Sequence, residues 1–326
     1  MSVPKRMRVG AIDIGSNSVR MLVADWALPL GPGTVAETVA RAGEVCRLGR
    51  GLDRTGAIEP ALAERAGDLA SDFVRRARAL GAIHVVIGAT AALRQASNRA
   101  EAAAIISRRA GIEVRVLSGD EEAQLVYLSV IAGLGGSVSR SPCVVFDLGG
   151  GSTEVVSGIG GQAGRWVSLP FGAVSLTERH LVTDPPAPDE IDSLRADVQD
   201  HLMHRCAYMP ARTPLLAGVG GTVTVLASLD RGLTSYEPAL IEGWLIAGDR
   251  LRALVDRLAT ASFSERLSWS VMGEGRADIA VAGALAVGEL AARFPSPGLT
   301  CSTRGLRFGI ARLAAEEALR EQQPPD

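Results

Sequence analysis

The chain has 326 residues, of which 47% are hydrophobic and 21% are charged, and its formal net charge is −2. This composition excludes a disordered chain, and the length favours two domains. The nearly balanced charge excludes a general attraction to nucleic acid or to a membrane, so neither partner is expected. Any polyanion must instead be bound by local arginines and backbone amides.

The cysteines and the apolar segments predict a cytoplasmic location. The four cysteines are far apart and form no Cys-x-x-Cys pair, which is typical of buried thiols in a reducing compartment. Asp13 interrupts the first apolar stretch, so no signal peptide is expected. The most apolar helix candidate, over 279–294, contains Glu289 and Arg293 and is too short to span a bilayer.

Strand-like and helix-like segments alternate along the chain, which is typical of an α/β fold. A hairpin is expected over 9–24, and a helix from Pro60 to about Leu80, because proline suits the first helical turn and Gly81 can end the helix. The next segments in chain order are a strand over 84–89, a helix over 98–110, a strand over 112–117, a helix over 118–132, a glycine- and serine-rich loop over 133–141, a hairpin over 143–157, a strand and turn over 215–222, a helix over 279–294 and a final helix over 304–320.

One short pattern occurs twice in the chain: an apolar strand, an acid, and a tight turn of small residues. The acid is Asp13 in the first copy and Asp147 in the second. Turns of glycine and serine leave backbone N–H groups available for phosphate oxygens. Two matched hairpins therefore predict two related domains that face each other across a cleft, although ordinary structural hairpins remain the alternative.

The second hairpin predicts a metal site. A two-residue turn at Gly150–Gly151 places Asp147 directly opposite Glu154. Like charges in this position repel each other, so a cation is expected between them. Two carboxylates suit Mg²⁺, which keeps several waters and contacts substrate phosphates. The predicted phosphate contacts of this turn are Gly149, Gly150, Gly151 and Ser152.

The first hairpin has a different pair of charges. A turn centred at Ser16–Asn17 places Asp13 opposite Arg20, and these opposite charges neutralise each other without a metal. We therefore expect phosphate binding rather than metal binding at this turn. Its predicted phosphate contacts are Gly15, Ser16, Asn17 and Ser18.

Two adjacent glutamates begin the helix predicted over 118–132. Glu121 follows Ser118 by three residues, as in a capping box, so its predicted role is structural. Glu122 is not needed for that cap and points about 100° away around the helix. It can act as a general base on a water that attacks phosphorus. A solvated carboxylate in the first helical turn is an equal alternative from position alone.

Two arginines and one further glycine turn are candidate phosphate contacts. Arg94 follows a buried strand and Arg276 precedes the helix over 279–294, and guanidinium groups can bind phosphate through two hydrogen bonds. A solvated surface position is the default alternative for each. Gly220, Gly221 and Thr222 lie between a strand and a helix, where backbone amides can bind another phosphate or a nucleotide.

Together these segments resemble the exopolyphosphatase/guanosine pentaphosphate phosphatase (Ppx/GppA) family over nearly the whole chain. The combination of the first hairpin, the Glu-Glu-Ala run and Asp-x-Gly-Gly-Gly-Ser-Thr-Glu is specific. The segments that carry the resemblance are Ala11–Ser18, Thr90–Arg94, Ser118–Leu125, Phe146–Glu154, Gly220–Thr222, Arg276–Gly283 and Ser302–Gly309.

The resemblance implies an actin-like fold of two ribonuclease-H-like domains around a cleft. The expected domains are residues 1–124 and 125–303, and the helix over 304–326 is a candidate to pack back on the first domain. The implied activity is Mg²⁺-dependent release of terminal orthophosphate from inorganic polyphosphate, and family members commonly form homodimers. Carried over by position, Glu122 is the catalytic base, Asp147 and Glu154 serve the metal and the lytic water, and phosphate is bound by Asp13 with the rest of the first hairpin, the second hairpin, Arg94 and Arg276.

Other functions are compatible with the same residues. The most similar alternative function is removal of the 5′ γ-phosphate of pppGpp at the same site. A non-catalytic sensor of (p)ppGpp or polyphosphate would use the same hairpins. A small-molecule kinase on the same fold would use the turn over 218–222 for adenosine, but the sequence shows no distinct motif for an acceptor substrate.

Overall fold

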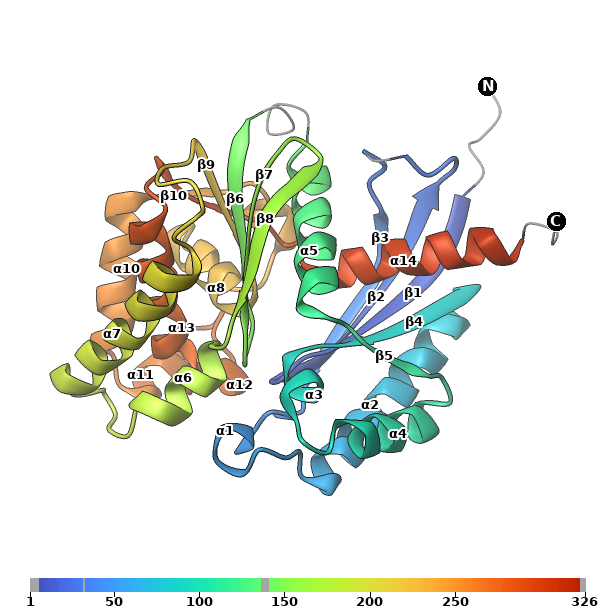
Figure 1. The fold of residues 1–326 in the computed structure, drawn as a ribbon, viewed down its shortest axis with the longest axis horizontal. Coiled ribbons are helices and arrows are strands. Elements are labelled where there is room, and N and C mark those ends of the chain that lie inside the picture. Colours follow the sequence, from blue (N-terminus) through green and yellow to red (C-terminus); the bar gives the residue numbers. More distant parts are fainter. Residues whose placement is uncertain (1–5, 32, 136–140, 323–326) are drawn as a thin grey trace. The chain divides into compact units, whose positions relative to one another are not determined.

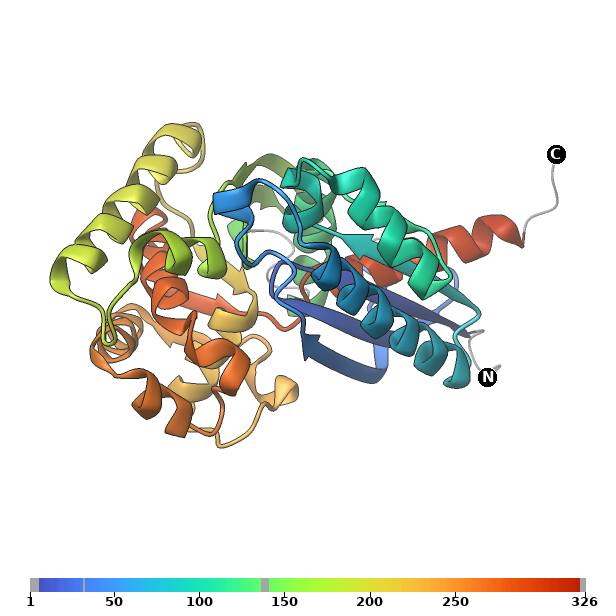
Figure 2. The same ribbon diagram turned by 90° about the horizontal axis from the view of Figure 1, so that it is seen from below.

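A computed structural model describes residues 6–31, 33–135 and 141–322 (Figures 1 and 2). Of the loop predicted over 133–141, residues 136–140 lie outside the described residues. The chain divides into two compact units, one formed by Met1–Ala132 with Leu306–Asp326 and the other by Gly133–Gly305. Each unit contains a mixed sheet and helices, which confirms the predicted α/β class.

In the first unit the sheet order is β3-β2-β1-β4-β5, with β1, β4 and β5 parallel and β2 and β3 antiparallel to their neighbours. Its strands are β1 (Arg6–Ile14), β2 (Ser18–Ala27), β3 (Glu37–Val45), β4 (His84–Ala89) and β5 (Val114–Val116). Its helices are α1 (Leu52–Thr55), α2 (Pro60–Ala79), α3 (Ala91–Gln95), α4 (Arg99–Ala110), α5 (Gly119–Leu134) and α14 (Leu306–Glu321).

Helices α2 and α14 cover opposite faces of this sheet. A Cβ atom at Gly10 of β1 would lie 3.0 Å from Cβ of Ala77 in α2, and one at Gly88 of β4 would lie 2.7 Å from Cδ1 of Ile310 in α14. Figure 1 shows α14 running along β1 and β4, and Figure 2 shows α2 and α4 side by side on the sheet. The last helix of the chain therefore completes the core of the first unit.

The first unit continues past the predicted boundary at residue 124. The reason is the packing of α5 on α14, because a Cβ at Gly309 would lie only 2.5 Å from Cβ of Leu125. The early turns of α5 thus belong to the same core as α14, and the division falls after Ala132.

In the second unit the sheet order is β10-β11-β9-β6-β7-β8. Its strands are β6 (Pro142–Leu148), β7 (Thr153–Ile159), β8 (Gln162–Leu169), β9 (Leu215–Val219), β10 (Leu245–Ala247) and β11 (Gly298–Cys301). Its helices are α6 (Ala173–His180), α7 (Pro188–Arg205), α8 (Gly221–Asp230), α9 (Pro238–Ile241), α10 (Gly248–Thr260), α11 (Phe263–Ser268), α12 (Glu274–Ala277) and α13 (Ala280–Arg293).

The apolar helix α13 is the centre of the second core. It packs against α6, α7, α8 and α10, and nearly all its side chains before Gly288 are buried. Across the residues that the structure describes, no helix combines the length and the apolar character needed to cross a membrane.

Candidate active site

The turn between β1 and β2 has the predicted length. Ile14 pairs with Val19, and the amide of Gly15 donates to the carbonyl of Ser18 at 3.0 Å, which leaves Ser16 and Asn17 as the turn residues. Asp13 therefore lies directly opposite Arg20, as the sequence predicts.

The predicted neutralisation of Asp13 by Arg20 is only partial. Within the described chain no ion pair joins the two side chains, and Nε of Arg20 instead donates to Oγ of Ser18 at 2.9 Å. Burial raises the pKa of Asp13, and the nearby charges of Arg20 and Arg307 oppose this effect without reversing it. Asp13 is thus a buried acid whose charge is only partly compensated by the first unit.

The segment that follows β3 donates backbone hydrogen bonds to the carbonyl oxygens of the first turn. The amides of Cys46 and Arg47 both donate to the carbonyl of Asn17, at 2.9 and 2.8 Å, and the amide of Gly49 donates to that of Ser16 at 2.8 Å. In a trans peptide the C=O and the next N–H point in opposite directions. The amides of Asn17 and Ser18 are therefore directed away from this segment, as an anion-binding turn requires.

Glu122 and Arg94 are brought together at the start of α5. The predicted capping box is present, because the amide of Ser118 donates to Oε2 of Glu121 at 2.9 Å and the Glu121 amide donates to Oγ of Ser118 at 3.2 Å. Glu122 is buried, and Nη1 of Arg94 donates to its Oε2 at 2.7 Å. The same Nη1 donates to the carbonyl of Leu117 at 3.0 Å, so the guanidinium is held against the start of α5.

In the second unit, Asp147 and Glu154 are cross-strand partners, as predicted. Glu154 is only 1% exposed, and Oγ of Ser168 donates to its Oε1 at 2.8 Å, whereas Asp147 is partly exposed. No group of three or more metal-ligating side chains is found among the described residues. The protein thus offers a pair of carboxylates, the set that suits a hydrated Mg²⁺ whose remaining ligands are waters and substrate phosphates.

The carbonyl oxygens of the turn after Asp147 likewise accept backbone hydrogen bonds, here from the start of α6. The amide of Ala173 donates to the carbonyl of Gly149 at 2.9 Å, and those of Val174 and Ser175 donate to the carbonyl of Gly150 at 2.8 and 3.1 Å. These bonds direct the amides of Gly150 and Gly151 away from α6. Within the described part of the chain, neither amide donates to a backbone carbonyl.

Gly172 allows α6 to approach this turn closely. A Cβ atom at Gly172 would lie 2.5 Å from the carbonyl carbon of Gly150 and 2.6 Å from the carbonyl oxygen of Gly149. Oγ1 of Thr153 adds a buried hydrogen bond of 2.8 Å to the carbonyl of Phe171. The close approach of α6 to this turn was not predicted from the sequence, where the only local signal is a glycine directly before a helix.

The turn that begins α8 lies against the same hairpin. Gly220 has a φ of 113°, and a Cβ there would lie 2.4 Å from the carbonyl oxygen of Leu148 and 3.4 Å from Oδ1 of Asp147. A Cβ at Gly305 would lie 3.5 Å from Oδ2 of Asp147. Gly220, the first of the three phosphate contacts predicted in this turn, therefore lies next to Asp147. The loop around Gly305 also lies next to Asp147, although its segment, Ser302–Gly309, entered the sequence analysis only as part of the family resemblance.

Arg276 lies on the short helix α12, directly before α13. This region is anchored by the buried Arg266, whose Nε donates to the carbonyl of Ala277 at 2.9 Å. A role of Arg276 in phosphate binding stays a prediction.

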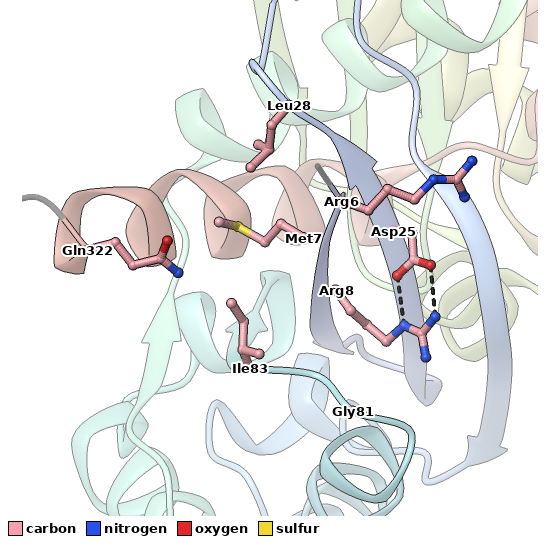
Figure 3. Close-up of a pocket in the computed structure, with 8 residues that line it drawn as sticks. All are labelled: Arg6, Met7, Arg8, Asp25, Leu28, Gly81, Ile83 and Gln322. Atoms are coloured by element: carbon pink, nitrogen blue, oxygen red, sulfur yellow. Dashed lines mark hydrogen bonds and ion pairs between the residues drawn. The ribbon is translucent and has the colours of Figure 1, made fainter. Parts of the chain in front are cut away.

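A cavity of about 520 Å³ lies elsewhere in the first unit (Figure 3). The residues that line it are Arg6, Met7, Arg8, Asp25, Leu28, Gly81, Ile83 and Gln322. Arg8 binds Asp25 through two hydrogen bonds of 2.7 and 2.8 Å, which lower the pKa of the Asp25 carboxyl. The cavity is at the start of β1 whereas Asp13 is near its end, so it is separate from the predicted phosphate-binding turn.

Comparison with known proteins identifies the family of the chain. Residues 31–316 match the Ppx/GppA phosphatase family. The chain belongs to this family. Exopolyphosphatase 2 of Mycobacterium tuberculosis is 34% identical over 316 residues, which are 93% of this chain and 97% of that protein. Exopolyphosphatase 1 of Mycobacterium bovis is 30% identical over 281 residues, covering 86% of this chain and 80% of its own length.

Solved structures of Ppx/GppA proteins have the same fold. The crystal structure of an exopolyphosphatase-like protein superimposes with a TM-score of 0.88 at 29% identity and covers 96% of this chain and 99% of its own. The Aquifex aeolicus family member gives 0.79 at 27% identity, with coverage of 98% and 100%. Nucleoside triphosphate hydrolases from Neospora caninum, at 11% identity and a TM-score of 0.54, share the fold alone. The expected actin-like fold of two ribonuclease-H-like domains is confirmed.

Proposed function

We propose that this Ppx/GppA protein is a Mg²⁺-dependent exopolyphosphatase, a hydrolase of phosphoric anhydride bonds that releases terminal orthophosphate from inorganic polyphosphate. The observation that carries the proposal is the second turn, where two glycine amides are directed away from α6 directly after Asp147 and before Glu154. The mycobacterial relatives named exopolyphosphatase, 34% and 30% identical to the chain, support this substrate.

The chemistry requires neutralisation of charge and placement of a water. Phosphoryl transfer proceeds with little covalent work by the protein, so charge stabilisation on the phosphoryl oxygens and an in-line nucleophile supply most of the catalysis. Backbone amides of the two turns, with Arg94 and Arg276, would bind those oxygens. Glu122 would take the proton from the attacking water, and its bond to Arg94 orients the carboxylate for that task.

Asp147 and Glu154 would hold Mg²⁺, which when bound supplies positive charge to the substrate phosphates. The facing carboxylates support this assignment independently of the family resemblance. A nearly fully buried Glu154 directly opposite Asp147 places two like charges together, and a divalent cation relieves their repulsion. Ser168 donates a hydrogen bond to one oxygen of Glu154 and so helps to orient the carboxylate.

The test is a comparison of orthophosphate release from short-chain polyphosphate, long-chain polyphosphate and pppGpp, each with and without Mg²⁺. We expect release from polyphosphate that requires Mg²⁺. Faster release from pppGpp than from either polyphosphate would instead favour the pppGpp phosphohydrolase. Tight binding of these compounds without any release would favour the sensor, and ATP-dependent phosphorylation of a small acceptor would favour the kinase. A homodimer and a cytoplasmic location stay predictions.

A further inference from the structure

The segment after β3, which donates hydrogen bonds to the carbonyls of the first turn, is rich in arginine. Arg47, Arg50 and Arg54 are all exposed, and Asp53 is the only acid between the first and the last of them. The phosphate contacts predicted from the sequence did not include this segment. We call residues 47–54 the arginine segment.

The backbone of the arginine segment is held in place next to Ser16 and Asn17. Its hydrogen bonds to both turn carbonyls are described above, and a Cβ at Gly49 would lie 2.9 Å from Cβ of Ser16. The side chains of Leu48 and Leu52 are 1% and 7% exposed and belong to the core of the first unit. These two leucines anchor the segment in the core, and Arg47, Arg50 and Arg54, which lie near them in the sequence, stay at the surface.

Arg47 has an unusual backbone conformation. Its φ is 57°, and no other residue except glycine has a positive φ in the part of the chain that the structure describes. A side chain at this φ costs conformational free energy that glycine would not cost. Residues kept in such conformations occur preferentially at functional sites, where the side chain is needed.

Arg50 provides an independent observation. Its exposed side chain makes no ion pair or hydrogen bond with any described residue. Arg50 shares this property with other exposed arginines of the unit, such as Arg78 and Arg108, whereas Arg109 pairs with Asp68 and Arg115 with Glu121. The guanidinium of Arg50 therefore keeps its full hydrogen-bonding capacity for a ligand.

We propose that Arg47 and Arg50 form a subsite for the phosphates that stay on the substrate after the terminal phosphate is cleaved. This inference rests on the proposed function and adds a binding site for a phosphoanhydride chain to it. Each guanidinium can make two charge-assisted hydrogen bonds to phosphate oxygens. A long polyphosphate offers more phosphates to this subsite than pppGpp or tripolyphosphate, so the contribution grows with chain length.

The test uses Arg47→Gly and Arg50→Gln, with Arg108→Gln as a control for loss of one exposed positive charge on α4. KM and kcat are measured with long-chain polyphosphate and with tripolyphosphate, and the melting temperature of each variant is recorded. We expect each of the two variants to raise KM for long-chain polyphosphate about tenfold, with kcat changed less than about twofold. The KM for tripolyphosphate should rise less, and the control variant should have the KM values of the wild type.

Arg47→Gly separates binding from folding, because glycine favours the backbone conformation at this position. Its melting temperature should equal or exceed that of the wild type even though KM rises. A lower melting temperature with unchanged KM would make the role of Arg47 structural and overturn its assignment.

Failure of the subsite is distinguishable from failure of the proposed function. Unchanged KM in both variants of an active enzyme would overturn the subsite alone. If the wild type released no phosphate, the proposed function would fail, and titration of long-chain polyphosphate into the three variants would still test the subsite. Equal affinities of wild type and variants in that titration would overturn it.

Discussion

The carboxylate of Glu122 and the guanidinium of Arg94 form an ion pair at 2.7 Å, although 28 residues separate them in the chain. Their side chains are only 7% and 21% exposed. The sequence identifies them as separate candidates, one for a base and one for phosphate binding. The structure joins their side chains, so a phosphate that bound to Arg94 would lie next to the carboxylate that is proposed to activate water.

Glu122→Gln should abolish phosphate release, because an amide cannot accept the proton of the attacking water. We expect kcat to fall by at least about 100-fold while the dissociation constant for polyphosphate stays within a few fold. Phosphate release and equilibrium binding are measured separately. The matched control is Glu121→Gln, which removes the adjacent charge from the capping box, and it should keep most of the activity. Unchanged turnover in Glu122→Gln would remove this residue from the mechanism.

Removal of the two carboxylate charges that face each other at the second turn should raise the melting temperature without Mg²⁺ and should abolish the stabilisation by Mg²⁺. The double variant Asp147→Asn, Glu154→Gln loses like-charge repulsion, so its melting temperature without Mg²⁺ should rise by about 2 °C or more. Mg²⁺ should stabilise the wild type, as any ligand specific for the native state does, and leave the double variant unchanged.

Melting curves with EDTA and with increasing Mg²⁺ make this comparison. Gln at position 154 can still accept the hydrogen bond from Ser168, so the local packing is kept. An equal Mg²⁺-dependent shift in the wild type and the double variant would place the metal elsewhere.

Gly172→Ala should displace the second turn from α6. The added Cβ would come within 2.6 Å of three backbone atoms of Gly149 and Gly150, so the turn must move. We expect kcat/KM to fall by about tenfold or more, since small displacements of binding groups are costly in catalysis, and the melting temperature to fall as well.

The control for this change is Gly161→Ala, because Gly161 lies in the β7–β8 turn and an added Cβ there would meet no atom within 4 Å. It should match the wild type in both measurements. If Gly172→Ala lowers the melting temperature but leaves kcat/KM unchanged, the packing of α6 on the turn has no part in positioning the amides.

Glu190 should make the stability of the second unit depend on pH. Hydrogen bonds from Thr183, Ala187 and Val182 lower the pKa of Glu190 to about 2 from an ordinary value of 4.5. The ionised carboxylate therefore stabilises the fold fully above about pH 4.5, and this contribution is lost as the pH falls toward 2.

Glu190→Gln should accordingly melt below the wild type at pH 7, and the difference should shrink between pH 4.5 and pH 2. Melting temperatures across this range test the prediction. Asp189→Asn removes a neighbouring exposed charge without touching these hydrogen bonds, and it serves as the reference. A constant difference at all pH values would show that the effect of the substitution does not depend on ionisation.

Features set by neighbouring residues could be predicted from the sequence. The two-residue turns, the pairing of Asp147 with Glu154 and the cap by Glu121 each depend on residues within a few positions. Strand β3 (Glu37–Val45) was missed because most of its side chains are exposed or half-exposed, as on an edge strand, and no apolar alternation marks it.

Contacts between distant segments could not be predicted from local patterns. The support of each turn by another segment depends on how strands and helices pack, and neither Gly172 nor the segment after β3 carries a motif for it. The same limit explains why Asp13 and Arg20 form no direct ion pair. Register alone placed Arg20 opposite Asp13, but the bond of Arg20 to Ser18 depends on side-chain conformation.

The position of α14 in the chain has a consequence for biosynthesis. Strands β1 and β4 leave the ribosome early, but the helix that covers one of their faces is translated only after the whole second unit. The contiguous second unit can therefore complete its core first, and the half of the protein that is made first is the last to fold. Until then the uncovered apolar face of the nascent sheet is a target for chaperones and for aggregation.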